Sequence, residues 1–192
     1  MDGGENSNFE TRRDALVAQI TAAFDGVSRE DGTTLHEAEA LDDRKSAREQ
    51  RAARALDLEE RWQDVPDKEI AWCCHALSFL DAKGFRYYLP AFMRYGLRHR
   101  GDPDDNGFIL SSCMHQLTQD FPTSVRKSDP AKMARVWNFT NAQSRAVAAF
   151  LRFVIEFEDG YACQATVEMV EKWGKFCEAG NDEAGATKAR RA

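Results

Sequence analysis

The run DPDDNGFILSSC, which ends at Cys113, has oxygen ligands spaced as in a helix–loop–helix calcium site. Asp102, Asp104 and Asn106 occupy alternating ligand positions, and Gly107 stands where such loops turn. The twelfth position is Cys113, where a calcium loop has a glutamate that supplies two oxygens. Because calcium does not favour a thiol ligand, tight binding is not expected, and the site is at most a weak one. The alternative is a turn in which Asp and Asn side chains bond their own backbone before a helix.

A second set of potential ligands is the CCH sequence at residues 73–75, with Cys113 and His115 further along the chain. Cysteine and histidine are the usual ligands of zinc. Adjacent residues of a helix point about 100° apart, however, and the chain has no C-x-x-C pair. We therefore interpret Cys73 and Cys74 as packed thiols, and we expect no metal and no cofactor.

Patterns for catalysis are weak. The sequence has no G-x-S-x-G and no glycine-rich phosphate loop, and His36-Glu37 lacks the second histidine of a zinc helix. Cys113 and His115 have the residue types of a nucleophile and a base, but residues two apart on a helix do not face each other. No pattern specifies a reaction.

The densest aromatic segment is residues 85–98, here called the aromatic–arginine stretch. If it is helical, its aromatic residues span more than one face, which predicts that some of them reach a groove or the surface. The alternative is that the aromatic residues are core and the arginines a solvated face. Pro90 lies inside the stretch and predicts a kink or break. The aromatic residues are Phe85, Tyr87, Tyr88, Phe92 and Tyr95, and the arginines are Arg86, Arg94 and Arg98.

A second candidate surface is the charged segment 42–51, which includes Asp42, Asp43 and Arg44. Between Leu41 and Ala52 its only apolar residue is an alanine, so it cannot bury much. We expect either one long charged helix between about residues 33 and 61, or two helices with a frayed joint.

The elements that position these residues are predicted to be helices, because apolar residues recur at intervals of three and four and clean alternation is absent. We predict an all-α, single compact domain of about six or seven helices over residues 11–177, with a flexible segment 1–10 and a disordered tail 178–192. Asp81 and the pair Thr140 and Gln143 are predicted helix caps. The expected helices are 12–25, one or two within 33–61, one opened by Pro66, 82–98, 108–119, a short turn at 131–136, one after Thr140 that ends near residue 159, and 162–177.

The composition limits the kind of partner. A net charge of −6 disfavours unspecific binding to nucleic acid or anionic lipid, because both require a basic surface. The polar start of the chain is unlike a secretory signal, and the longest apolar run, residues 146–157, is interrupted by Arg152 and Glu156. An odd set of five cysteines suits reduced thiols. We predict a cytoplasmic protein without a membrane span.

The segments ALSFLDAKGFRYYLPAFM, residues 76–93, and FTNAQSRAVAAFLRFV, residues 139–154, resemble an uncharacterised bacterial family. The shared phrases are close to SFL-x-x-x-GFRYYLPA and to a C-terminal T-x-x-Q-x-x-AV-x-x-FL helix. The resemblance covers about residues 14–157. The resemblance implies a compact, mostly helical cytosolic domain and does not indicate any particular activity.

These observations favour a small acidic protein that acts by binding a protein partner, and an immunity or antitoxin-like inhibitor is the most concrete role of this class. Acidic charge would speed the capture of a basic toxin or effector. The alternatives are an enzyme of unknown reaction with a groove beside Pro90, or a weak divalent-cation module at residues 102–113. The candidate partner-binding residues are Arg86, Tyr87, Tyr88, Arg94, Tyr95, Arg98, Asp42, Asp43 and Arg44.

Overall fold

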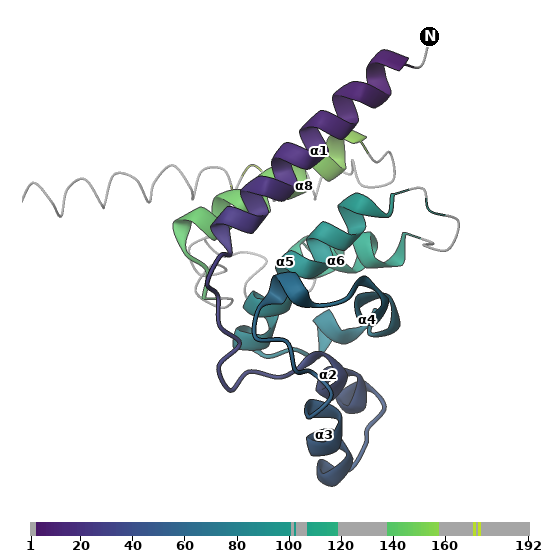
Figure 1. Cartoon of the computed structure of the whole chain (residues 1–192), viewed down its shortest axis with the longest axis vertical. Coiled ribbons are helices and arrows are strands. Elements are labelled where there is room, and N and C mark those ends of the chain that lie inside the picture. Colours follow the sequence, from purple (N-terminus) through teal and green to yellow (C-terminus); the bar gives the residue numbers. More distant parts are fainter. Residues whose placement is uncertain are drawn as a thin grey trace, which may run out of the picture. The chain divides into compact units, whose positions relative to one another are not determined.

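A computed structural model describes residues 3–100, 102, 107–118, 138–157, 171 and 173 of the chain. Within these residues every regular element is a helix, which confirms the predicted all-α class, and the seven α-helices described agree with the predicted six or seven (Figure 1). The chain divides into two compact units. One contains Met1–Leu16 and Phe121–Ala192, and the other contains Val17–Asp120. The predicted helical turn at 131–136 and the tail 178–192 lie outside the described residues.

The helices of the chain have clear bounds in the structure. The helix α1 begins at Gly3 rather than at residue 12 as predicted, and α5 and α6 agree closely with prediction. Two short 3-10 helices, η1 and η2, lie between the longer elements. The helices are α1 (Gly3–Ala23), α2 (Leu35–Asp42), α3 (Ala47–Arg54), η1 (Trp62–Asp64), α4 (Asp67–Trp72), η2 (Ala76–Ser78), α5 (Ala82–Arg98), α6 (Phe108–Thr118) and α8 (Asn141–Phe157).

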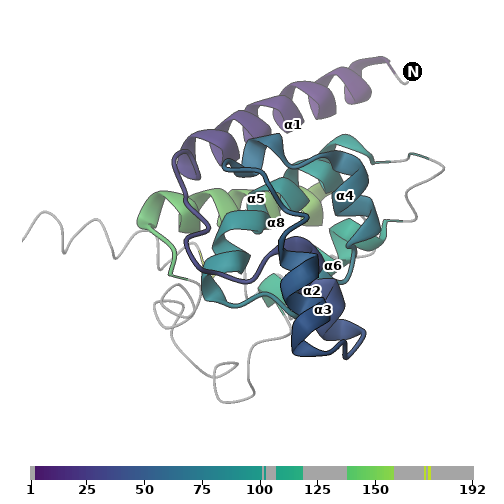
Figure 2. The ribbon, with the colours of Figure 1, turned by 60° about the horizontal axis from the view of Figure 1, so that its bottom comes forward.

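The centre of the Val17–Asp120 unit is α5, which contacts α4, α6, η1 and η2 (Figure 2). From Gly84 to Leu97 every residue of α5 except Arg86 is buried. The helix passes through Pro90 without interruption, so the predicted break does not occur, whereas the predicted kink stays a prediction. A helix with apolar residues on all sides is stable only where other elements cover it all round.

The start of α5 is fixed by a side chain, as the sequence predicts. One carboxylate oxygen of Asp81 accepts hydrogen bonds from the backbone N–H groups of Gly84, at 2.8 Å, and Thr33, at 3.0 Å. The first bond caps the helix, and the second ties the preceding turn to it.

Replacing Asp81 with alanine is expected to lower the free energy of unfolding by about 1–2 kcal/mol, because both N–H groups lose their acceptor. Chemical denaturation measures this difference. Asp81→Asn, which retains an oxygen acceptor, should lose less. Equal stability of the alanine variant and the wild type would show that the cap contributes nothing.

The other unit has an aromatic cluster between the start of α1 and α8. The ring of Phe9 lies 5.3 Å from that of Phe153 and 5.2 Å from that of Phe157, measured between centroids. Arg12 forms two hydrogen bonds of 2.5 Å with the carboxylate of Glu156. The apolar anchor at Phe9, within a polar segment, explains why α1 begins earlier than its apolar pattern predicts.

The predicted cap of α8 is confirmed. The backbone N–H of Thr140 donates to Oε1 of Gln143 at 2.9 Å, and the N–H of Gln143 donates to Oγ1 of Thr140 at 3.2 Å. This reciprocal pair is a capping box. It fixes the first turn of the helix that the sequence predicts after Thr140.

Candidate functional site

The segment predicted as a charged helix forms two helices, α2 and α3, which pack against each other (Figure 2). They are joined by an ordered turn in which Arg44 has φ 55°, a left-handed conformation, and the N–H of Lys45 donates to the carbonyl of Ala40 at 2.9 Å. Ser46 then caps α3, because the N–H of Glu49 donates to its hydroxyl and its own N–H donates to Oε2 of Glu49. The expected frayed joint is therefore wrong, and the S-x-x-E spacing is the signal that predicts the second helix.

Helix α3 contributes no buried residue. Arg44, Arg48 and Arg51 are exposed, and none of them forms a side-chain ion pair within the described residues. Arg54 differs, since it pairs with Glu37 at 2.6 Å. The three arginines therefore keep their charge available to another molecule. We call Arg44, Arg48 and Arg51, with the exposed Asp42 and Asp43 before them, the α2–α3 surface.

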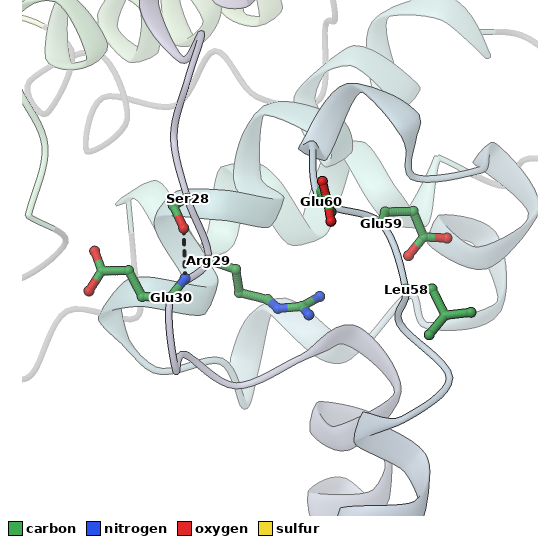
Figure 3. A pocket seen from close by; sticks show the side chains of 6 residues that line it. All are labelled: Ser28, Arg29, Glu30, Leu58, Glu59 and Glu60. Carbon is green, nitrogen blue, oxygen red and sulfur yellow. Dashed lines mark hydrogen bonds between the residues drawn. The ribbon is translucent and has the colours of Figure 1, made fainter.

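Two leucines follow α3 and remain in contact with solvent. The side chains of Leu56 and Leu58 are 61% and 81% exposed. Leu58 also lines a hollow of about 330 Å³ (Figure 3). These exposed leucines follow the unpaired arginines in the sequence, so this part of the chain exposes both apolar area and charge, as protein interfaces do.

The hollow is walled by two short segments, residues 28–30 and 58–60 (Figure 3). Arg29 is held in place because its guanidinium donates to the Tyr88 hydroxyl at 2.7 Å and to the backbone carbonyl of Asp57 at 3.2 Å. Glu30 is paired with Lys83 at 2.9 Å. Arg29 and Glu30 therefore have partners within the fold, and the carboxylates of Glu59 and Glu60 also line the hollow.

The aromatic–arginine stretch is not a surface. All five of its aromatic residues are buried, so the expectation that some would be exposed is wrong. The tyrosine hydroxyls find partners inside the unit: Tyr87 donates to the backbone carbonyl of Glu59 at 2.9 Å, and Tyr88 accepts from Arg29. Burial raises the pKa of Tyr87 to about 12 and raises the pKa of Tyr88 as well. Tyr95 is also buried, stacked on His99.

The arginines of this stretch differ from one another in exposure. Arg94 is buried, and its guanidinium donates to the backbone carbonyls of Gln63 at 2.9 Å and Val65 at 3.2 Å. Burial lowers the pKa of Arg94. Arg86 is mostly buried and lies 3.4 Å from a carboxylate oxygen of Glu30. Arg98 is exposed, so it is the one surface residue among the three arginines of this stretch.

The predicted metal ligands do not come together in the described part of the chain. Asp104 and Asn106 lie outside the described residues, and Asp102 contacts the ring of His99 at 3.4 Å. Across residues 3–100, 107–118 and 138–157, no group of three or more potential ligands is placed to hold a metal ion. Cys113 is buried, and burial raises its pKa, so the thiol stays protonated at neutral pH. Pro90 is also buried, and it is not one of the residues that line the hollow.

A further cluster joins three segments that are distant in the sequence. Nδ1 of His36 lies 2.8 Å from Oδ1 of Asp57, and Nε2 lies 3.3 Å from Oε2 of Glu69. The other oxygen of Asp57 accepts from the backbone N–H of His36 at 2.9 Å, at the start of α2. No local signal could have revealed this cluster, because its members lie far apart in the sequence.

A family model, described as a family of unknown function (DUF6714), matches residues 12–175. The chain belongs to this family. No curated protein and no solved structure matches it. Within the described residues, none of the helices combines the length and the apolar character needed to cross a membrane.

Proposed function

We propose that this member of the family is a protein-binding module whose α2–α3 surface recognises an acidic face of a partner protein. The observation that carries the proposal is a capped helix, α3, with no buried residue and unpaired arginines. Such a helix contributes little to the core of its own unit, so its exposed side chains are available for recognition.

The local charge favours an acidic partner. Residues 42–54 contain five cationic and three acidic side chains, although the whole chain has a net charge of −6. The basic toxin or effector predicted from net charge therefore fits this surface less well than an acidic protein does. An inhibitory role of the immunity or antitoxin kind remains compatible with such a partner. The exposed Leu56 and Leu58 favour a protein over a phosphate backbone, which offers no apolar surface.

Replacing Arg44, Arg48 and Arg51 together with glutamine is expected to weaken partner binding about tenfold or more, because each arginine loses its charge-assisted contacts. The free energy of unfolding of the variant should differ from that of the wild type by no more than about 0.5 kcal/mol, since no buried group changes. Full-length wild-type and variant chains serve as bait in quantitative co-purification, and the recovered partner is then titrated calorimetrically.

The matched control changes the same number of charges elsewhere. Arg98, Arg145 and Arg152 are exposed and form no side-chain ion pair within the described residues, and their triple glutamine variant should retain binding. Equal weakening by both triple variants would indicate a general charge effect, and retention by both would exclude the surface. If nuclease treatment abolished co-purification of the partner, nucleic acid would be identified as the bound molecule, and the proposal would be contradicted.

A further inference from the structure

Helix α4 is a short element held at two positions by histidines from other elements. It has six residues, Asp67–Trp72, and Ile70 is its buried residue. A helix of this length is not stable alone in water, so its position depends on tertiary contacts. Its first residue, Asp67, contacts His99, and Glu69 contacts His36.

The first histidine is fixed between two carboxylates. The ring of His36, on α2, has Asp57 at one nitrogen and Glu69 at the other, at 2.8 Å and 3.3 Å. The side chain of His36 is 18% exposed and that of Asp57 is 3% exposed. The ring therefore joins α2, the segment after α3, and α4.

The second histidine has the same arrangement. Nε2 of His99, which follows α5, lies 3.0 Å from Oδ2 of Asp67, and Nδ1 lies 3.4 Å from Oδ2 of Asp102. The ring stacks on Tyr95 with centroids 4.2 Å apart, which restricts its orientation. The C-terminal end of α5 is thereby joined to the start of α4.

The chemistry of imidazole makes these contacts sensitive to protonation. An ionised carboxylate only accepts hydrogen bonds, and a neutral imidazole has a single N–H. A ring between two carboxylates can donate to both only as the imidazolium. Loss of one proton leaves a nitrogen lone pair facing a carboxylate oxygen, which is repulsive.

We propose that α4 is a pH-sensitive element, held in place while the His99 ring donates to both Asp67 and Asp102 as the imidazolium and loosened when that ring loses a proton. The inference is independent of the proposed partner. Its direct consequence concerns Trp72, the last residue of α4, whose side chain is 77% exposed. Loosening of α4 changes how this large apolar side chain is presented to solvent.

Other charged groups lie around the two rings. Lys68 is 3.4 Å from Glu69, and Arg94 is 3.6 Å from Asp67. These cations attract the carboxylates and repel the positive charge of an imidazolium ring. Around the His36 cluster, Arg29 donates to the backbone carbonyl of Asp57, and the buried thiol of Cys73 and the hydroxyl of Tyr88 also lie near the Asp57 carboxylate. Around the His99 cluster, Arg98 lies near Arg94.

The direction of the pH effect follows from His99. The hydrogen bond to Asp67 raises the pKa of His99 above its ordinary value. A histidine whose pKa is higher in the folded than in the unfolded state stabilises the fold fully below its unfolded pKa, near 6.5. That stabilisation is lost as the pH rises through the folded pKa. The attachment of α4 should therefore weaken on the alkaline side of about pH 6.5.

Hydrogen exchange of the full chain, followed by NMR between about pH 5 and about pH 9, tests the proposal. The reporters are the amides of Ile70 and Cys73, which donate within α4, and the amide of Phe85 at the start of α5 serves as reference. After correction for intrinsic exchange, the protection of α4 relative to α5 should fall about tenfold or more across the transition. The ring signals of His99 recorded in the same samples should shift with the same midpoint.

Two variants sharpen the test. The double variant His36→Gln and His99→Gln should show low α4 protection throughout and no transition, whereas His115→Gln, on the exposed side of α6, should follow the wild type. Protection of α4 that stays constant relative to α5 in the wild type would overturn the proposal. A double variant with the wild-type transition would overturn it as well. The wild-type titration decides the question even if the double variant does not fold.

Discussion

Replacing Arg94 with alanine is expected to lower the free energy of unfolding by about 3 kcal/mol. The substitution removes the donors for two backbone carbonyls, those of Gln63 and Val65, and a buried acceptor left without a donor loses about 1–3 kcal/mol. It also removes a guanidinium that lies 5.5 Å from the ring centroid of the buried Trp62. Chemical denaturation followed by circular dichroism gives the free energy directly.

Arg98→Ala is the matched control on the same helix. Arg98 is exposed, so its loss should change the free energy of unfolding by no more than about 0.5 kcal/mol. Arg94→Lys should recover part of the loss, because an ammonium can reach one carbonyl but cannot form the fork of a guanidinium. Comparable stability of Arg94→Ala and Arg98→Ala would mean that the buried hydrogen bonds do not stabilise the fold.

Replacing Gly84 with alanine is expected to lower the free energy of unfolding by about 2–3 kcal/mol. A Cβ atom at this position would lie against the backbone carbonyl oxygen of Thr33, well inside van der Waals contact. The facing Gly32 is as tightly placed, since a Cβ there would lie 2.6 Å from the backbone nitrogen of Gly84. The energetic cost of this overlap exceeds the roughly 1 kcal/mol by which alanine is favoured over glycine inside a helix.

Gly96→Ala is the control, because it makes the same substitution near the other end of α5. The nearest atom to its added Cβ is Cδ1 of Leu110 at 3.2 Å, the end of a flexible side chain. The free energy of unfolding should therefore change by no more than about 1 kcal/mol. Thermal unfolding of the two variants in parallel compares them, and an equal effect would contradict the close approach at Gly84.

Helices with strong end signals were predictable from the sequence. Asp81 marks the start of α5, and Thr140 with Gln143 marks the start of α8, because each signal is a hydrogen bond between residues three apart. The division into α2 and α3 could also have been predicted from the sequence, since Ser46 and Glu49 form the same kind of local pair. Local hydrogen bonds depend on neighbouring residues, which a sequence displays directly.

The burial of α5 was not predictable from aromatic spacing alone. The prediction assumed one buried face, and under that assumption the tyrosines had to reach the surface. In the structure other elements surround the helix, and backbone carbonyls such as that of Glu59 accept from the tyrosine hydroxyls. The clusters around His36 and His99 depend on contacts between distant segments, and no local pattern carries that information.

The candidate surface was predicted in part. Asp42, Asp43 and Arg44 are exposed, as expected for a segment with almost no apolar residues. The exposure of Leu56 and Leu58 was not predictable, because isolated leucines normally indicate core. Their exposure depends on how the chain leaves α3, which is a property of the tertiary structure.

The absence of buried side chains in α3 has a consequence for how the family can diversify. Its cap and its turn are local, so the residues between them can be exchanged with little effect on folding. If α3 binds a partner as proposed, affinity and selectivity could then change in small, independent mutational steps. Of the described helices, α3 is the one whose side chains can change with the least risk of unfolding the protein.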